Sequence, residues 1–118
     1  MLFRSCLYAI GNFYACTTHL ASTSGTVALD QCKDLTNNLI PQVRAPGGFA
    51  PTVLGGDWNL KFHGSPDAQA CVPAGYYRKG DGDVQHIMVT SDLVFSSSKS
   101  IAMHHTDHDG WFVAVTAP

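Results

Sequence analysis

The stretch Gly55-Gly56-Asp57-Trp58-Asn59 follows a short apolar run and marks the end of a buried strand. Glycine permits a sharp backbone path and lets another group approach the chain closely. In an extended segment, Asp57 and Asn59 point to one side and Trp58 to the other. A carboxylate beside a neutral amide suits a phosphate, because the carboxylate holds a water or metal ion and the amide donates to a phosphate oxygen. An Asx turn after a strand is the alternative interpretation.

A histidine and an aspartate–histidine pair lie on either side of this stretch. The run Thr-Thr-His-Leu at residues 17–20 places His19 at the end of an apolar strand, where a lone histidine is more often structural than catalytic. The run Thr-Asp-His-Asp at residues 106–109 contains Asp107 and His108. Such a pair suits general acid–base chemistry, because a carboxylate orients an imidazole and stabilises its charged form. Together the segments predict strand-end groups that meet around a phosphate ester.

The histidine-rich segment around His108 leaves other interpretations open. His104 and His105 precede it, and imidazole binds zinc, copper and nickel well, so a non-enzymatic metal-binding module is one alternative. Neighbouring residues of an extended loop point to opposite sides, so at most two or three of these side chains would converge. A solvated loop before the last strand is the other alternative.

Length and composition restrict the class of protein. The 118 residues suit one domain with a modest core. Because 45% of the residues are hydrophobic and only 14% are charged, the chain is expected to fold rather than remain disordered. A net charge of −2 provides no broad basic surface, which argues against a pure nucleic-acid-binding module but not against an enzyme. No apolar run approaches the roughly 20 residues of a membrane span.

The four cysteines, Cys6, Cys16, Cys32 and Cys71, lack Cys-x-x-Cys spacing, which argues against zinc. Cys6 and Cys16 lie symmetrically about Gly11, so a hairpin turning there would set them opposite each other, within reach of a disulfide. Four buried free thiols are the alternative. Oxidised cysteines would place the protein outside the cytoplasm, so a secreted or extracellular location is expected, although the first residues are not typical of a signal peptide.

The remaining pattern predicts strands around one helix. The strands are expected at residues 3–10, 13–18, 52–54, 84–89, 92–95 and 111–115. A helix is expected from Thr26, because apolar residues recur there at helical spacing; Pro41 and then the run Ala-Pro-Gly-Gly at residues 45–48 are expected to end it. Residues 61–82 are expected to form a surface loop, and residues 96–100 a polar connector. This order predicts an α/β fold with a mixed, mainly antiparallel sheet and one covering helix, which leaves the other sheet face apolar and uncovered.

In their order along the chain, these motifs resemble the endonuclease/exonuclease/phosphatase superfamily, which includes pancreatic-type deoxyribonuclease, abasic-site endonucleases, sphingomyelinases and inositol phosphate phosphatases. Residues 16–20 look like its Thr-His-Leu strand end, and residues 56–59 look like its Gly-Asp-Phe-Asn motif. Residues 106–108 are similar to its Ser-Asp-His motif, and residues 84–87 to its Ile-Asp-Tyr/His-Ile strand. The resemblance covers nearly the whole chain and implies half of a four-layer α/β sandwich.

The resemblance also implies a function, that of a metal-dependent hydrolase of phosphoester bonds similar to a nuclease or phosphodiesterase. His19 would contact or protonate the phosphate, while Asp57 and Asn59 would orient the water and bind oxygens. Asp107 would help to hold Mg²⁺ or Mn²⁺, and His108 would act as general base or transition-state donor. The cation would neutralise charge on the phosphate of a nucleic acid, a phospholipid or a small phosphoester.

The sequence departs from the family pattern in two places. The family has an aspartate where Gln85 stands, often to support the catalytic histidine; Gln85 can hydrogen-bond an imidazole but cannot stabilise its cation by charge, and Asp83 is a possible replacement. The family's metal-binding asparagine and glutamate come from an N-terminal half that has no counterpart here. Residues 1–118 are therefore expected to be a partial domain that needs a missing segment or self-associates, and a catalytically inactive remnant is the alternative to an enzyme.

Overall fold

The computed structural model describes residues 3–9 and 13–117. Its strands are β1 (Phe3–Ala9), β2 (Phe13–His19), β3 (Thr52–Asp57), β4 (Tyr76–Gly80), β5 (Gln85–Thr90), β6 (Val94–Ile101) and β7 (Gly110–Thr116). Its helical segments are α1 (Gly25–Asp34), the π-helical η1 (Leu35–Leu39), α2 (Ile40–Arg44) and the 3₁₀ turn η2 (Ala68–Cys71). No helix in the described ranges is long and apolar enough to cross a bilayer.

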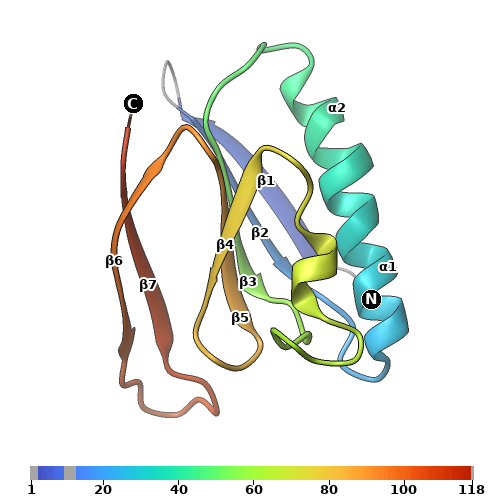
Figure 1. Ribbon diagram of the computed structural model, residues 1–118, viewed down its shortest axis with the longest axis vertical. Helices are drawn as coiled ribbons and strands as arrows, with labels where there is room; N and C mark the ends of the chain where they lie inside the picture. The colour runs from blue at the N-terminus through green and yellow to red at the C-terminus, as the bar shows by residue number, and fades with distance from the viewer. Residues whose placement is uncertain (1–2, 10–12, 118) are drawn as a thin grey trace.

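The larger sheet has the order β1-β2-β3-β5-β4. Only β2 and β3 pair in parallel, and the other neighbouring strands are antiparallel. Two parallel neighbours need a crossover connection, which the helical segments supply as they pass over one face of the sheet (Figure 1). The predicted fold class, an α/β protein with a mixed, mainly antiparallel sheet and a covering helix, is confirmed.

The first two strands form the predicted hairpin. Cys6 lies opposite Cys16 in the antiparallel register, with the two Cα atoms 4.0 Å apart, and a disulfide joins them. The predicted turn at Gly11 and Asn12 lies outside the described residues. The hairpin register therefore identified one of the two disulfides correctly.

The helix continues past Pro41, the first predicted stop signal, and ends at Arg44, directly before the second, residues 45–48. Ser24 caps its start, where the Ser24 side chain accepts a hydrogen bond from the Val27 backbone N–H. The wider π-helical turn of η1 precedes the proline, and there the Ile40 N–H bonds to the Leu35 carbonyl, five residues back. This wider turn relieves the clash between a proline ring and the carbonyl four residues earlier, so the helix continues through Pro41 as α2.

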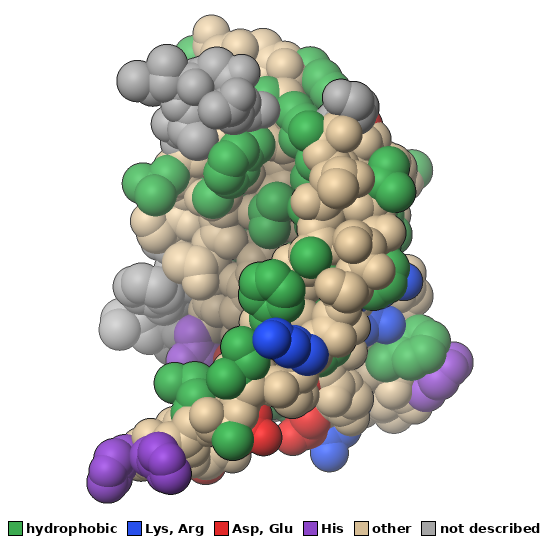
Figure 2. All heavy atoms as spheres, turned by 90° about the vertical axis from the view of Figure 1, so that its left-hand side faces the viewer, with side chains coloured by type: hydrophobic (Ala, Val, Ile, Leu, Met, Phe, Trp, Pro, Cys, Tyr) green, Lys and Arg blue, Asp and Glu red, His purple; other side chains and the backbone are tan. Residues whose placement is uncertain are grey.

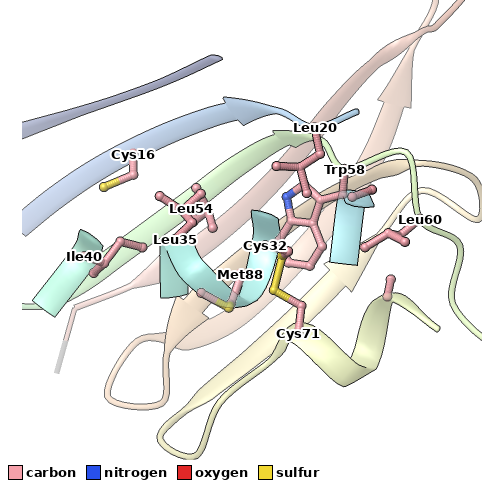
Figure 3. Packing of buried hydrophobic residues seen from close by; sticks show 12 residues of the cluster. Cys16, Leu20, Cys32, Leu35, Ile40, Leu54, Trp58, Leu60, Cys71 and Met88 are labelled. Carbon is pink, nitrogen blue, oxygen red and sulfur yellow. A yellow bond between two sulfur atoms is a disulfide. The ribbon is translucent and has the colours of Figure 1, made fainter. Parts of the chain in front are cut away.

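The core lies between the helix and the larger sheet (Figure 3). Leu54 and Met88 from the sheet meet Leu35 from the helix there, and each is at most 1% exposed. Trp58 is fully buried in the same cluster, as the predicted alternation around Asp57 requires. A second disulfide, which the sequence analysis did not predict, links Cys32 of α1 to Cys71 of η2 within this core.

The opposite face of the sheet is partly covered, which corrects the expectation of a bare face. Strands β6 and β7 form a separate two-stranded sheet on that side (Figure 1). Trp111 Nε1 of β7 donates to the Lys79 carbonyl of β4 at 3.0 Å, and the Tyr77 hydroxyl of β4 donates at 2.6 Å to the carbonyl of Leu93, directly before β6, so the small sheet is fastened to β4. On the outer face of β1 and β2, the described side chains of Leu7 and Phe13 are 69% and 38% exposed.

Two predicted loops contain regular structure. Residues 61–82, expected to be a loop, include η2 and β4, and β4 is the edge strand of the larger sheet. Residues 96–100, expected to be a polar connector, form most of β6. Every residue of β6 is exposed, so this strand carries no alternation of buried and exposed side chains that the sequence could reveal.

Candidate active site

Two predicted site residues end neighbouring parallel strands. His19 closes β2, Asp57 closes β3, and the two are register partners. Gly56 brings the strands together: its φ is 149°, and a Cβ at this position would collide with the Thr18 carbonyl oxygen. Close pairing therefore requires glycine directly before Asp57, and it places the His19 and Asp57 side chains at the same sheet edge.

The two carboxylate oxygens of Asp57 have different surroundings. Oδ1 accepts a hydrogen bond from the Asn59 backbone N–H at 2.9 Å, which is an Asx turn. Oδ2 lies 3.6 Å from His19 Nε2 and 3.7 Å from His108 Nε2. The Asp57 side chain is 18% exposed, whereas that of His19 is 62% exposed. One oxygen thus fixes the turn, while the other faces two imidazoles at the surface.

His108 reaches this edge from the connection between β6 and β7. It is the half-buried member of an exposed segment, residues 102–109, and its side chain is 34% exposed. Asp107 Oδ1 lies 3.9 Å from His108 Nε2, but the Asp107 side chain is 91% exposed. Figure 2 looks onto the β6–β7 side, and in its lower part acidic side chains lie at the centre with histidine side chains to the left and to the right. The structure therefore brings together His19, Asp57, Asp107 and His108.

Asn59 lies close to Asp57, but its side chain is not oriented as it would be in an extended chain. Its φ of 51° shows that the chain turns sharply after β3, so the period-two alternation stops at the strand end. The Asn59 side-chain amide donates to the Leu20 carbonyl at 2.6 Å and ties the segments after β2 and β3 together. In this arrangement, the Asn59 amide N–H is engaged with the backbone of the site.

Gln85 and Asp83 also have definite partners. Gln85 is the register partner of Asp57, and its Nε2 donates to the Asp109 carbonyl at 2.7 Å. This side-chain bond thus goes to the backbone beside His108 and not to the imidazole. Asp83 Oδ1 lies 3.5 Å from Lys61 Nζ, so this carboxylate pairs with a lysine.

A buried histidine that the sequence analysis did not assign supports the site from the core side. His86 is 1% exposed; its Nε2 lies 2.6 Å from the Leu60 carbonyl oxygen, and its Nδ1 lies 2.9 Å from Arg78 Nη1. Because the carbonyl only accepts and the guanidinium only donates, His86 is neutral with its proton on Nε2. Burial is the main cause that lowers the pKa of His86, and the nearby Arg78 charge lowers it further. His86 thereby anchors the turn after Asp57. No pattern in the sequence of β5 indicated that His86 is buried.

The oxygen ligands at this edge do not make a magnesium site by themselves. Mg²⁺ prefers near-octahedral oxygen ligands. Of the two carboxylates beside His108, Asp57 uses Oδ1 in its turn, and Asp107 projects into solvent. Within residues 3–9 and 13–117, no group of three or more histidine, cysteine, aspartate or glutamate side chains is placed to hold a metal ion, and this includes the segment around His104 and His105.

Comparisons with known proteins identify the fold. No protein-family profile matches the sequence, and no curated protein sequence matches it. A mannosyl-6-phosphatase from Bacteroides thetaiotaomicron superposes with a TM-score of 0.73 at 14% identity over 91% of this chain. An endonuclease/exonuclease/phosphatase protein from Bacteroides vulgatus gives 0.70 at 15% identity over 92%. TDP2 from D. rerio, solved with a single-strand DNA product, gives 0.65 at 18% identity over 98%.

This chain matches only part of each solved structure. This chain covers 52% of the phosphatase, 51% of the Bacteroides vulgatus protein and 61% of TDP2. It therefore spans a little more than half of their length, while nearly all of its own length is matched. The chain has the fold of part of an endonuclease/exonuclease/phosphatase domain, as the resemblance of its motifs predicted.

Proposed function

We propose that the protein hydrolyses phosphoester bonds at the edge formed by His19, Asp57 and His108. The observation that carries the proposal is the position of Asp57 Oδ2, which faces imidazole nitrogens of both histidines at 3.6 and 3.7 Å. These three side chains come from two strand ends and a distant loop, and they converge at an accessible edge of the sheet. The solved structures of the same fold include a phosphatase and a protein with a DNA product, which agrees with phosphoester chemistry.

The three side chains supply the proton transfers of hydrolysis. Asp57 orients a water molecule and accepts its proton as the water oxygen attacks phosphorus. The P–O bond to the leaving group then breaks, and His19, as an imidazolium, donates the proton that the leaving oxygen needs. In this scheme His19 contacts or protonates the phosphate, and His108 donates to a phosphate oxygen in the transition state; such groups typically contribute about 10²–10⁴-fold each.

A requirement for Mg²⁺ or Mn²⁺ is also proposed from the family resemblance, but it needs ligands beyond those described. Asp107 is the carboxylate best exposed for such an ion, which would neutralise phosphate charge when bound. One exposed carboxylate is a weak site, so we expect Mg²⁺ alone to bind residues 1–118 only at millimolar concentration. Calorimetric titration tests this expectation, and micromolar binding would contradict it.

The two disulfides support an oxidising location, and we propose that the protein is secreted or extracellular. Its substrate is proposed only as a class: a phosphate ester of a nucleic acid, a phospholipid or a small molecule.

The proposed activity is tested with a generic phosphodiester, a phosphomonoester, DNA and RNA, each assayed with and without Mg²⁺. His108→Ala is compared with the wild type and with His63→Ala, a matched control. His63 stacks on Phe62 and lies 3.9 Å from Asp67, away from the proposed cluster. We expect His108→Ala to lose activity and His63→Ala to retain it. Equal rates in the wild type and in His108→Ala would show that the activity is background and would reject the proposal in favour of an inactive remnant.

A further inference from the structure

We propose that Gln85 is a positioning residue that fastens the His108 segment to the sheet and so holds His108 against Asp57. This inference rests on the proposed function, because positioning matters only if His108 takes part in the reaction. At position 85 the sequence departs from the family pattern, and Gln85 would act through a hydrogen bond to the backbone.

Two adjacent contacts connect the neighbouring strands β3 and β5 to the segment that contains His108. Asp57 and Gln85 face each other in the β3–β5 register. Asp57 Oδ2 lies 3.7 Å from His108 Nε2, and Gln85 Nε2 donates to the Asp109 carbonyl at 2.7 Å. Consecutive residues of the segment are therefore held by opposite residues of the sheet.

The Gln85 bond matters because packing does little to hold this segment. All of residues 102–109 are exposed except His108, which is half-buried. In the part of the chain that the structure describes, the other hydrogen bond made by these residues is local, from the His108 backbone N–H to Thr106 Oγ1 at 3.3 Å. A segment with few buried contacts samples many conformations unless a specific bond restricts it. Gln85 provides that bond one residue away from His108.

Gln85 itself is fixed on the sheet. It lies at the start of β5, its backbone N–H is 3.3 Å from Asp81 Oδ1, and its side chain is not free to follow the loop. The amide must act as donor in the bond to Asp109, because a carbonyl oxygen only accepts. A carboxylate at position 85 would lack this donor at neutral pH. Two roles of a side chain at position 85 can therefore be distinguished. An amide donates a hydrogen bond to the backbone, whereas a carboxylate supports the imidazole by its charge.

Gln85→Glu and Gln85→Ala test these roles against each other. Both variants remove the donor, and the glutamate also adds a charge close to His108. We expect both to lower kcat by roughly 10–100-fold, the usual cost of losing an orienting contact, with KM changed less than kcat. Gln42→Ala, an exposed glutamine on α2, is the matched control and should behave as wild type. If Gln85→Glu matched or exceeded the wild type, charge support would suffice and the proposal would be wrong.

A double-mutant cycle separates positioning from general stability. If Gln85 acts through His108, then Gln85→Ala should cost nothing further in a His108→Ala background. Thermal unfolding of Gln85→Ala should remain close to that of the wild type, because the residue lies at a surface edge. Equal losses of kcat in both backgrounds would overturn the proposal.

An NMR measurement keeps this inference distinct from the proposed activity. Asp57→Asn should shift the His108 ring resonances in the wild-type background, because the carboxylate is 3.7 Å away. The shift should shrink at least severalfold in Gln85→Ala if the segment has moved away. An inactive wild type with this loss of coupling would reject the proposed function and uphold the positioning role; unchanged coupling would reject the positioning role.

Discussion

The two carboxylate oxygens of Asp57 make different contacts. Oδ1 closes the turn with the Asn59 N–H, and Oδ2 faces His19 and His108. An asparagine at this position keeps an oxygen acceptor for the turn but removes the negative charge and the proton-accepting oxygen. The residue therefore allows its two tasks to be tested separately.

Asp57→Asn is expected to lower hydrolysis of a phosphodiester by roughly 10²–10⁴-fold, because the proposed general base is lost. The thermal unfolding midpoint should stay close to that of the wild type, because the turn keeps its acceptor. Asp30→Asn, on the exposed side of α1, is the matched control. The expectation fails if Asp57→Asn hydrolyses the substrate at the wild-type rate, or if Asp30→Asn loses activity equally.

His86 should make stability depend on pH. Burial lowers the pKa of His86 in the folded state, and the charge of Arg78 adds to this effect, whereas the Leu60 hydrogen bond and the charges of Asp81 and Asp57 oppose it. The unfolded chain, with a histidine pKa of about 6.5, then binds the proton more readily than the folded chain. The stabilisation is fully present above the unfolded value and is lost as the pH falls from there toward the folded value.

Denaturant unfolding at pH 7.5, 6.5 and 5.5 measures this effect. The wild type is expected to lose more free energy of unfolding than His86→Gln over this range, because glutamine can replace the donor and the acceptor but does not titrate. Parallel losses in the two proteins would show that His86 does not contribute to acid sensitivity.

At the scale of elements, the two disulfides should contribute unequally. The Cys32–Cys71 bond has a sequence separation of 39 and links the helix to η2, whereas the Cys6–Cys16 bond has a separation of 10 and joins strands that are already paired. Closing the longer loop restricts the unfolded chain more, by about 1 kcal/mol on the chain-entropy model.

Replacing Cys32 and Cys71 together by alanine is therefore expected to lower the free energy of unfolding by about 2–4 kcal/mol, and replacing Cys6 and Cys16 should cost less. Urea unfolding of both double variants under oxidising conditions provides the comparison. A greater loss from the Cys6 and Cys16 pair would contradict this ranking.

The elements also show how far the sequence could be interpreted. The hairpin disulfide between Cys6 and Cys16 follows from local register, and the strand-end motifs carry their own turn signals. Pro41 misled the prediction because a π-helical turn accommodates it, a tertiary detail that propensity does not encode. Only the start of β6 was predicted, because the serine-rich part that follows is wholly exposed and has no buried face. The pairing of Cys32 with Cys71 required the long-range packing of η2 on α1.

The same distinction between local features and long-range packing applies to the candidate site. His19, Asp57 and His108 were predicted because each belongs to a motif at a strand end or in a polar loop. The Asx turn at Asp57 was one of the two interpretations of its motif, whereas the side-chain bonds of Asn59 and Gln85 were not predictable, because each depends on where a distant segment lies. Sequence spacing identifies which groups are available; the fold decides which atoms they meet.

On the scale of the whole molecule, we expect the exposed apolar side chains on the outer face of β1 and β2 to govern behaviour in solution. Leu7 is 69% exposed and Phe13 is 38% exposed on this face, and the solved structures of the same fold are nearly twice as long as the region they share with this chain. Exposed apolar sheet surface favours association.

We therefore expect residues 1–118 to self-associate in a concentration-dependent manner. Leu7→Glu combined with Phe13→Glu should shift the protein toward monomer in analytical ultracentrifugation, because burying two carboxylates at a contact is unfavourable. Phe62→Glu, at an exposed aromatic on another part of the surface, is the control. A wild-type chain that remains monomeric at high concentration would contradict the prediction.

We expect His19, Asp57 and His108 to hold a phosphoryl group together, which a phosphate titration followed by NMR would detect. With ¹³C-labelled histidine, the ring resonances of His19 and His108 should shift along one binding curve as inorganic phosphate is added. The resonances of His63, which lies outside the cluster, should stay in place. If His19 and His108 do not respond, or respond no more than His63, phosphate does not bind between them and the account is wrong.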